Sequence, residues 1–453
     1  MKTVKYFFAI LLISLTFSTL KSQTIKYEEF KLKNGLQVLL IDYGNVEATY
    51  MEILVNAGTK NETPGLQGIS SFTASALLYG NKKYDKIKQT DLLYSLGTNL
   101  NANSGINSSS ISLLVANKNF ETGIDIFSNA IRYPSFPVED VKQEISQFVQ
   151  YNNPKKLDIT DLATKFSNLF VFGTSNPLGR NSYPTQIMKI SAKEIKEFYD
   201  FNYTPKNTRL VFCGKLDKVK IKTLVEFYFG DWVSVYGENN QVNLESPSFK
   251  GREFGFVNRD DATQVCLNWT KKAPGFGDKD MMAFLIAQNV FNNKLFEEVR
   301  EKLGKTYGIG MAFNELQNKK IFTIGTQTRS AEMYSTILAV DKVLNDFYTT
   351  GITEKELKNS CLKLRNNYLS ISSPDGICNY YNYLCYPDIA KRMNLLNELN
   401  SQTVEGINKV IKKYFSSENY KLMIAGNEKD LAEQLNKLKG LRKFEPNAIE
   451  VDQ

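Results

Sequence analysis

The sequence contains no histidine at any of its 453 positions. A catalytic triad built on histidine, a histidine metal ligand and an imidazole acid–base are therefore excluded. A strong excess of one charge is also lacking, because 56 lysine and arginine residues stand against 48 acidic residues, a formal net charge of +8. No block of like charges concentrates this small excess, which argues against a nucleic-acid partner.

Cysteine is scarce as well, and the chain has five: Cys213, Cys266, Cys361, Cys378 and Cys385. The odd number leaves at least one free thiol, and the spacing fits neither a zinc ribbon nor a C-x-x-C motif. Cys213 and Cys266 lie in apolar, strand-like runs, which predicts that both are small core residues. A disulfide between Cys378 and Cys385 stays open as an alternative to free thiols.

Long hydrophobic runs are missing except at the amino terminus. There, Lys2 and Lys5 precede an apolar run over residues 6–17, and small and polar residues follow over 18–23. This pattern is typical of a signal peptide over residues 1–22, since a membrane-spanning helix needs about 20 apolar residues. We expect a secreted chain, periplasmic in a Gram-negative source, with no membrane span after cleavage. An uncleaved anchor is the alternative.

The composition that is present is that of a globular protein, with 42% hydrophobic and 23% charged residues. A helix–loop–strand pattern containing Ile195 and Gly214 recurs with Ile407 and Gly426, an offset of 212 residues (407 − 195 = 426 − 214). This repeat predicts an N-terminal domain over residues 23–235 and a C-terminal domain of the same fold over 251–453. The polar, turn-rich segment 236–250 is the expected linker.

Several elements of the first domain have local signals. Asn34-Gly35 between apolar alternations predicts a hairpin over 30–41, and β-branched residues predict a strand over 48–56. Apolar spacing predicts a helix over 66–78, a strand over 110–115, and long helices from about 120 and 137. The order of elements predicts an α+β fold with mainly antiparallel sheets packed with helices.

One segment resembles a known catalytic motif. Residues 56–81, "NAGTKNETPGLQGISSFTASALLYGN", resemble the zinc-site region of the insulinase/pitrilysin peptidase family, which includes the mitochondrial processing peptidase. In that family a helix carries H-x-x-E-H, whose two histidines hold zinc while the glutamate activates the bound water. A second glutamate, about 75 residues further on, completes the metal site. The resemblance extends over residues 27–435.

The residues of that motif are replaced in this chain. The two histidine positions are Ser71 and Ser75, the general-base position is Ala74, and the distant glutamate falls at or beside Tyr151. Serine hydroxyls are poor zinc ligands and alanine takes no proton, so we expect no metal cofactor on this chain and no zinc peptidase activity from it alone. Ser71 and Ser75 are otherwise small residues on a packed helix face, because a serine nucleophile has no histidine or suitably placed lysine to activate it.

A second part of the family pattern is retained. The segment "FNNKLFEEVREKLGKTYGIGMAF" resembles a helix-to-strand segment of the family's C-terminal domain, with matches at Leu295, Phe296, Arg300, Glu301, Leu303, Gly304 and Tyr307. The resemblance implies that Arg300 holds a peptide carbonyl and that the Tyr307 hydroxyl stabilises a developing oxyanion. The alternatives are a helix-surface pairing of Arg300 with Glu297 or Glu301, and a Tyr307 that caps a core strand.

A third element is the segment "LGTNLNANSGINSSSISLLV", which resembles the family's substrate-side strand, with Asn101 and Ala102 at the matching positions. Such an edge accepts an extended peptide by strand addition. A polar loop that enters a strand is the alternative.

The resemblance implies a function for the whole chain. Family members of this length enclose a chamber as pairs, so we expect half of a peptidase clamshell. The chain would be the non-zinc subunit of a heterodimer that degrades small unfolded peptides, with zinc held by a homologous partner subunit. A non-catalytic peptide-binding or structural homodimer is the alternative.

Overall fold

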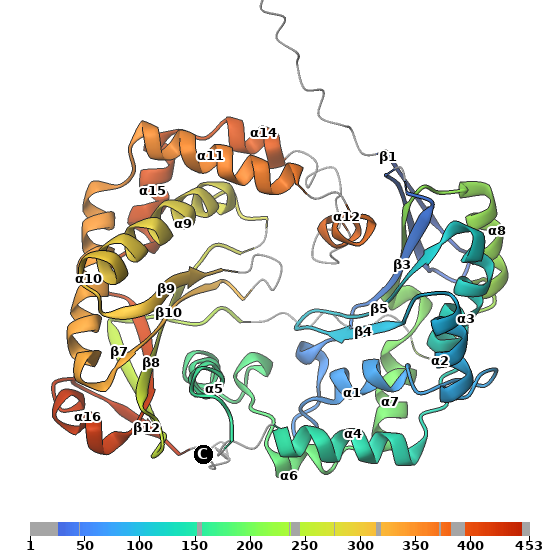
Figure 1. Cartoon of the computed structure of the whole chain (residues 1–453), viewed down its shortest axis with the longest axis horizontal. Coiled ribbons are helices and arrows are strands. Elements are labelled where there is room, and N and C mark those ends of the chain that lie inside the picture. The colour runs from blue at the N-terminus through green and yellow to red at the C-terminus, as the bar shows by residue number, and fades with distance from the viewer. Residues whose placement is uncertain are drawn as a thin grey trace, which may run out of the picture.

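The structure is a computed structural model. It describes residues 26–44, 46–151, 156–234, 236, 245–275, 277–313, 319–370, 373–381 and 395–445. The predicted signal peptide and Cys385 lie outside these residues, so the structure does not bear on either. Within the described part of the chain, the strands form two six-stranded sheets, each packed with helices (Figure 1).

The first sheet has the strand order β1-β2-β6-β3-β5-β4, and among its pairings that of β2 with β6 is parallel. Its strands are β1 Lys26–Lys31, β2 Gln37–Asp42, β3 Ala48–Val55, β4 Asn101–Ser104, β5 Ser109–Ala116 and β6 Thr208–Gly214. The predicted hairpin is confirmed, with Gly35 at φ +98° in the turn between β1 and β2. Asn34 fixes that turn, because its Nδ2 donates to the carbonyl oxygens of Phe229 at 2.6 Å and Trp232 at 3.0 Å.

The second sheet repeats this plan with the order β12-β7-β11-β8-β10-β9. Its strands are β7 Arg252–Asn258, β8 Gln264–Lys272, β9 Thr306–Ala312, β10 Ile321–Arg329, β11 Tyr420–Gly426 and β12 Arg442–Phe444. The matched pair Ile195 and Ile407 lies fully buried on helices α7, Ala192–Asn202, and α15, Val404–Tyr414, and the matched glycines end β6 and β11. The expected α+β fold of two repeated, mainly antiparallel halves is therefore confirmed.

Helices from the same half cover one face of each sheet (Figure 1). On the first sheet these are α1 Ile69–Ala76, α2 Lys86–Ser95, α3 Phe120–Arg132, α4 Val138–Tyr151, α7 Ala192–Asn202 and α8 Lys218–Phe229. On the second sheet they are α9 Met281–Leu295, α10 Met333–Thr350, α11 Glu354–Leu369, α14 Leu395–Asn400, α15 Val404–Tyr414 and α16 Glu428–Leu435.

The other face of each sheet is covered by a helix from the opposite half (Figure 1). Helix α5, Ile159–Phe172, packs on the second sheet, where the rings of Phe166 and Phe170 lie 5.9 and 5.5 Å from the ring of Phe444. Helix α12, Pro374–Tyr381, packs on the first sheet through Ile377 and Cys378. The two halves are thus interlocked by the exchange of one helix each.

The buried cysteines follow from this packing. Cys213 on β6 and Cys266 on β8 are 0% and 1% exposed, which confirms the prediction that they are core residues. Cys378 is also buried, and its Sγ lies 3.5 Å from the carboxylate of Glu52 on β3. Within the described residues, no helix combines the length and apolarity needed to cross a bilayer.

Candidate functional site

Helix α1 carries the substituted metal positions, and its start is held by a buried carboxylate. Gly68, at φ +100°, precedes the helix and has no side chain to cap it. Glu62 takes this role, because its carboxylate accepts hydrogen bonds from the Ser70 amide at 3.2 Å and the Ser70 hydroxyl at 2.6 Å. Burial raises the pKa of Glu62 above its ordinary value. Arg180 donates to the Glu62 carbonyl oxygen at 3.3 Å and to two further backbone carbonyls, which anchors the loop.

The four substituted positions differ in exposure. Ser71 is exposed, Ser75 is half-buried, and Tyr151 at the end of α4 is 79% exposed. Ala74 is 1% exposed and is packed inside the molecule. Glu144 of α4 is a neighbouring carboxylate, and burial raises its pKa although the hydroxyls of Tyr79 and Ser75 partly offset that rise.

These residues do not fit a zinc ion. Zinc in proteins is held by thiolate, imidazole and carboxylate groups, whereas the four positions offer two hydroxyls, a methyl group and a phenol turned to solvent. Glu144 is a single neighbouring carboxylate, whose Oε2 is buried without a hydrogen-bond partner in the described structure, and one carboxylate alone does not make a zinc site. Within the part of the chain that the structure describes, no three histidine, cysteine or acidic residues are grouped to hold a metal ion.

The burial of Ala74 gives a stability prediction. Replacing Ala74 with glutamate, the residue of the family's general base, places a carboxylate at a closed position and should lower the free energy of unfolding by about 3 kcal/mol. Ser71→Glu is the matched control on the same helix, and at its exposed position it should change stability by less than about 0.5 kcal/mol. Urea unfolding measures both, and equal, small effects would contradict the packing described for Ala74.

Strand β4 lies beside α1 at the edge of the first sheet (Figure 1). Among the described strands it pairs with β5 alone, with Asn101 opposite Ser112 and Ala102 opposite Ile111. Asn101 is exposed, while Ala102 packs against the core. The predicted substrate strand and the substituted metal positions are thus neighbours in the first half.

Arg300 lies in the π-helical segment Phe296–Lys302 that continues α9. Such segments are rare and occur frequently at functional sites. The guanidinium is exposed and stacks over the ring of Phe296 at 4.6 Å. The ion pairs described for this turn join Lys302 to Glu297 at 3.0 Å and to Glu298 at 2.5 Å, and do not include Arg300.

Tyr307 follows the π-helical segment in the sequence and lies near the start of the edge strand β9. Its side chain is 86% exposed, so the ring does not cap a strand in the core. Among the hydrogen bonds described for the chain, none involves its hydroxyl. No described contact joins Arg300 or Tyr307 to α1 or β4, so the two groups of candidate residues are held by different halves.

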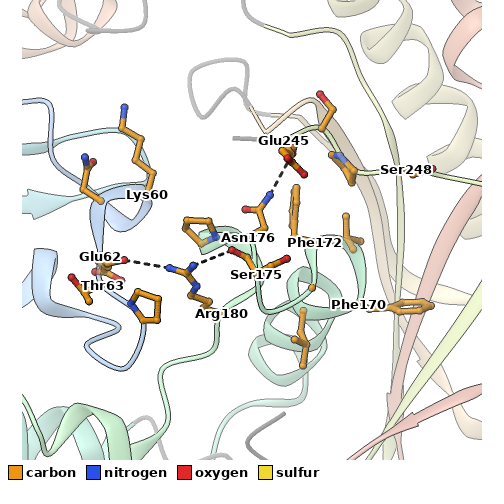
Figure 2. Close-up of a pocket in the computed structure, with 18 of the residues that line it drawn as sticks. Lys60, Glu62, Thr63, Phe170, Phe172, Ser175, Asn176, Arg180, Glu245 and Ser248 are labelled. Atoms are coloured by element: carbon orange, nitrogen blue, oxygen red, sulfur yellow. Dashed lines mark hydrogen bonds between the residues drawn. The ribbon is translucent and has the colours of Figure 1, made fainter. Parts of the chain in front are cut away.

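A pocket that the sequence did not predict lies between the halves. It encloses about 1060 Å³ and is lined by the loop before α1, the end of α5, and residues of β11 and β12 (Figure 2). Lys60, Arg180, Lys421 and Arg442 line it, yet Arg180 donates to backbone carbonyls and Lys421 to the Phe170 carbonyl at 3.0 Å. Because the lining segments are far apart in the sequence, no local sequence pattern predicts that they come together.

The repeated α+β halves and the substituted zincin motif on α1 define a metallopeptidase-like chain. A family profile described as insulinase (peptidase family M16) matches residues 37–159, and one described as peptidase M16 inactive domain matches residues 189–364. The chain belongs to the peptidase M16 (insulinase) family.

Curated relatives match over most of the chain. An uncharacterized zinc protease of Bacillus subtilis, YmxG, is 20% identical over 410 residues, which are 88% of this chain and 97% of that protein. The zinc protease PqqE of Helicobacter pylori is 23% identical over 414 residues, 86% of this chain and 90% of that protein.

Solved structures share the fold. A peptidase M16 inactive domain from Pseudomonas fluorescens has a TM-score of 0.79 at 19% identity and covers 88% of this chain and 98% of its own. The periplasmic protease PqqL of Escherichia coli has a TM-score of 0.74 at 15% identity, over 94% of this chain and 49% of that protein. The expected fold is therefore confirmed, and this chain corresponds to about half the length of PqqL.

Proposed function

We propose that the chain is the non-zinc subunit of a heterodimeric zinc metallopeptidase. The observation that carries this proposal is the contrast between the two halves. The first half has no residue at the family's metal positions that fits zinc, while the second half presents Arg300 and Tyr307 to solvent without using either in an ion pair or hydrogen bond described here. Exposed donors that make no ion pair or hydrogen bond to the described residues are suited to act on a neighbouring molecule.

The chemistry of the two side chains supports a role at a scissile peptide bond. Arg300 offers a charged, forked donor that can hold a peptide carbonyl. The Tyr307 hydroxyl can donate to the oxyanion that forms when a carbonyl is attacked, and such a preorganised donor contributes strongly to rate. Both would act on a peptide bound in the site of a homologous, zinc-bearing partner subunit.

Small unfolded peptides are the proposed substrates. The edge of β4 can take an extended peptide by strand addition, with Asn101 exposed beside it. An unfolded peptide can adopt the extended backbone that this mode of binding needs. Export to the periplasm is part of the proposal, because the amino-terminal 22 residues have the pattern of a signal peptide and the similar protease PqqL is described as periplasmic.

A second candidate is a non-catalytic structural or peptide-binding homodimer. It is favoured by the similarity to cytochrome b-c1 complex subunit 1 of Caenorhabditis elegans, which is 23% identical over 266 residues, 56% of this chain and 54% of that protein. A structural subunit has no need for Arg300 or Tyr307 to contact a substrate. Contact between a bound peptide and position 307 therefore distinguishes the peptidase subunit from the structural homodimer.

Photo-crosslinking tests that contact. A benzoylphenylalanine placed at position 307 should crosslink to a bound unfolded peptide when the chain is mixed with a zinc-bearing relative from the same genome that retains H-x-x-E-H. Position 94 is the control, because Tyr94 is 85% exposed but lies on α2 in the other half. Equal crosslinking at both positions, or none at 307, would favour the structural candidate.

A further inference from the structure

Strand β9 carries an extra residue at the position of Tyr307. The register between β9 and β10 slips between Thr326 and Thr328, so that Tyr307 and Gly308 together lie opposite the single residue Gln327. This arrangement is a β-bulge, which bends the strand and redirects the side chain that it carries. A bulge also removes backbone polar groups from the ladder, and these need other partners when they are buried.

Two buried threonines supply those partners. Thr306 and Thr326 are 9% and 6% exposed, and their hydroxyl oxygens lie 2.7 Å apart. The Gly308 amide donates to Thr306 Oγ1 at 3.1 Å, and the Gly308 carbonyl accepts from Thr326 Oγ1 at 2.8 Å. The Gln327 carbonyl accepts from Thr306 Oγ1 at 2.5 Å. Two hydroxyl groups therefore bond three backbone groups of the bulge, the Gly308 amide and the carbonyls of Gly308 and Gln327.

Lys305, just before the bulge, is also held by hydrogen bonds, and one of them connects it to the segment of Arg300. The Thr328 hydroxyl donates to the Lys305 carbonyl, and the Lys305 ammonium pairs with Glu332 at 2.5 Å. The Lys305 amide donates to the carbonyl of Val299 at 3.1 Å, in the π-helical segment that carries Arg300. Lys305 thus joins the threonine side chains near the bulge to the π-helical segment.

We propose that Thr326, with Thr306, is a positioning residue for Tyr307. Its hydroxyl stabilises the bulge that turns the tyrosine ring outward, and the inference rests on the proposed function of Tyr307 as a donor to a partner's substrate. Valine has nearly the shape of threonine but cannot donate. In Thr326→Val the Thr306 hydroxyl, which lies 2.9 Å from the Gly308 carbonyl and 2.5 Å from the Gln327 carbonyl, has one proton for the two, so one carbonyl of the bulge loses its donor. A bulge that loses its partners can relax toward another register, which moves the side chains that it carries.

The first test is peptide hydrolysis by the complex of the full chain with its zinc-bearing relative. Thr326→Val should lower kcat about tenfold and leave KM within about twofold, because the donor is displaced rather than removed. Thr326→Ser, which keeps the hydroxyl, should restore the rate. Thr270→Val removes a buried threonine hydroxyl from β8 of the same sheet and should leave the rate unchanged.

The double variant decides whether the effect passes through Tyr307. If Thr326 acts through the tyrosine, Thr326→Val should cost little further rate in a Tyr307→Phe background. A full additional loss in that background, or a Thr326→Val variant with wild-type kcat, would overturn the inference. The proposed function fails separately, if Tyr307→Phe alone has no effect.

The environment of the Tyr307 ring can also be measured by ¹⁹F NMR on this chain alone, without the partner. With 3-fluorotyrosine placed at position 307, the ¹⁹F resonance should shift or broaden in Thr326→Val and keep its wild-type position in Thr326→Ser and Thr270→Val. An unchanged resonance in Thr326→Val would overturn the positioning role, whatever the enzyme assays show.

Discussion

Replacing Tyr307 with phenylalanine should lower kcat of the assembled peptidase about 100-fold while changing KM little. Loss of one preorganised oxyanion donor costs on the order of a hundredfold or more in rate, because the donor acts on charge that develops only in the transition state. The ring is 86% exposed, so the change removes no core packing and should not alter folding. Steady-state hydrolysis of a fluorogenic unfolded peptide, with this chain and its zinc-bearing relative mixed in equal amounts, measures both constants.

Tyr94→Phe is the control for this experiment. Tyr94 is 85% exposed and loses the same hydroxyl, but it lies on α2 of the first half. It should keep the wild-type kcat. Wild-type kcat in Tyr307→Phe as well would remove the catalytic-donor role of the tyrosine.

Replacing Phe166 with alanine should lower the free energy of unfolding by about 3 kcal/mol or more. Phe166 is 1% exposed on α5 and packs against Phe444 and the second sheet, and truncation of a buried phenylalanine costs about 3–5 kcal/mol. Because α5 belongs to the first half and covers the sheet of the second, both halves should lose stability together.

The two tryptophans make this shared loss measurable. Trp232 reports on the first half and Trp269 on β8 of the second, so variants that keep one tryptophan each follow urea unfolding of one half. Phe166→Ala should move both midpoints equally, while Phe227→Ala, at a ring 73% exposed, should move neither by much. A shift confined to the Trp269 signal would show that the halves unfold independently.

Local sequence signals predicted most elements of the first half. The strand predicted over residues 48–56 is β3, and the strand predicted over 110–115 is β5. The helix predicted from residue 66 begins at Ile69 instead. Its apolar spacing was correct, but Gly65 and Gly68 adopt φ of +92° and +100°, and this left-handed backbone keeps the residues before Ile69 in a turn.

The exchange of α5 and α12 could not be predicted from the sequence. Helix α5 is largely apolar, which indicates that it is buried but not which sheet covers it, and α12 is too short and mixed in composition to indicate burial at all. The bulge at Tyr307 was missed for a related reason, since it depends on the register between β9 and β10 and not on a local motif. The family resemblance placed Arg300 and Tyr307 in one segment, but only the structure showed both side chains exposed.

Whether the chain is a non-zinc peptidase subunit is best tested by peptide hydrolysis with this chain alone, its zinc-bearing relative alone, and the two mixed, with assembly followed by size-exclusion chromatography. A non-zinc subunit should hydrolyse no peptide alone, and strong hydrolysis should appear in the fraction where the two chains elute together. Hydrolysis by this chain alone, or two chains that elute apart with no gain in rate, would contradict this role.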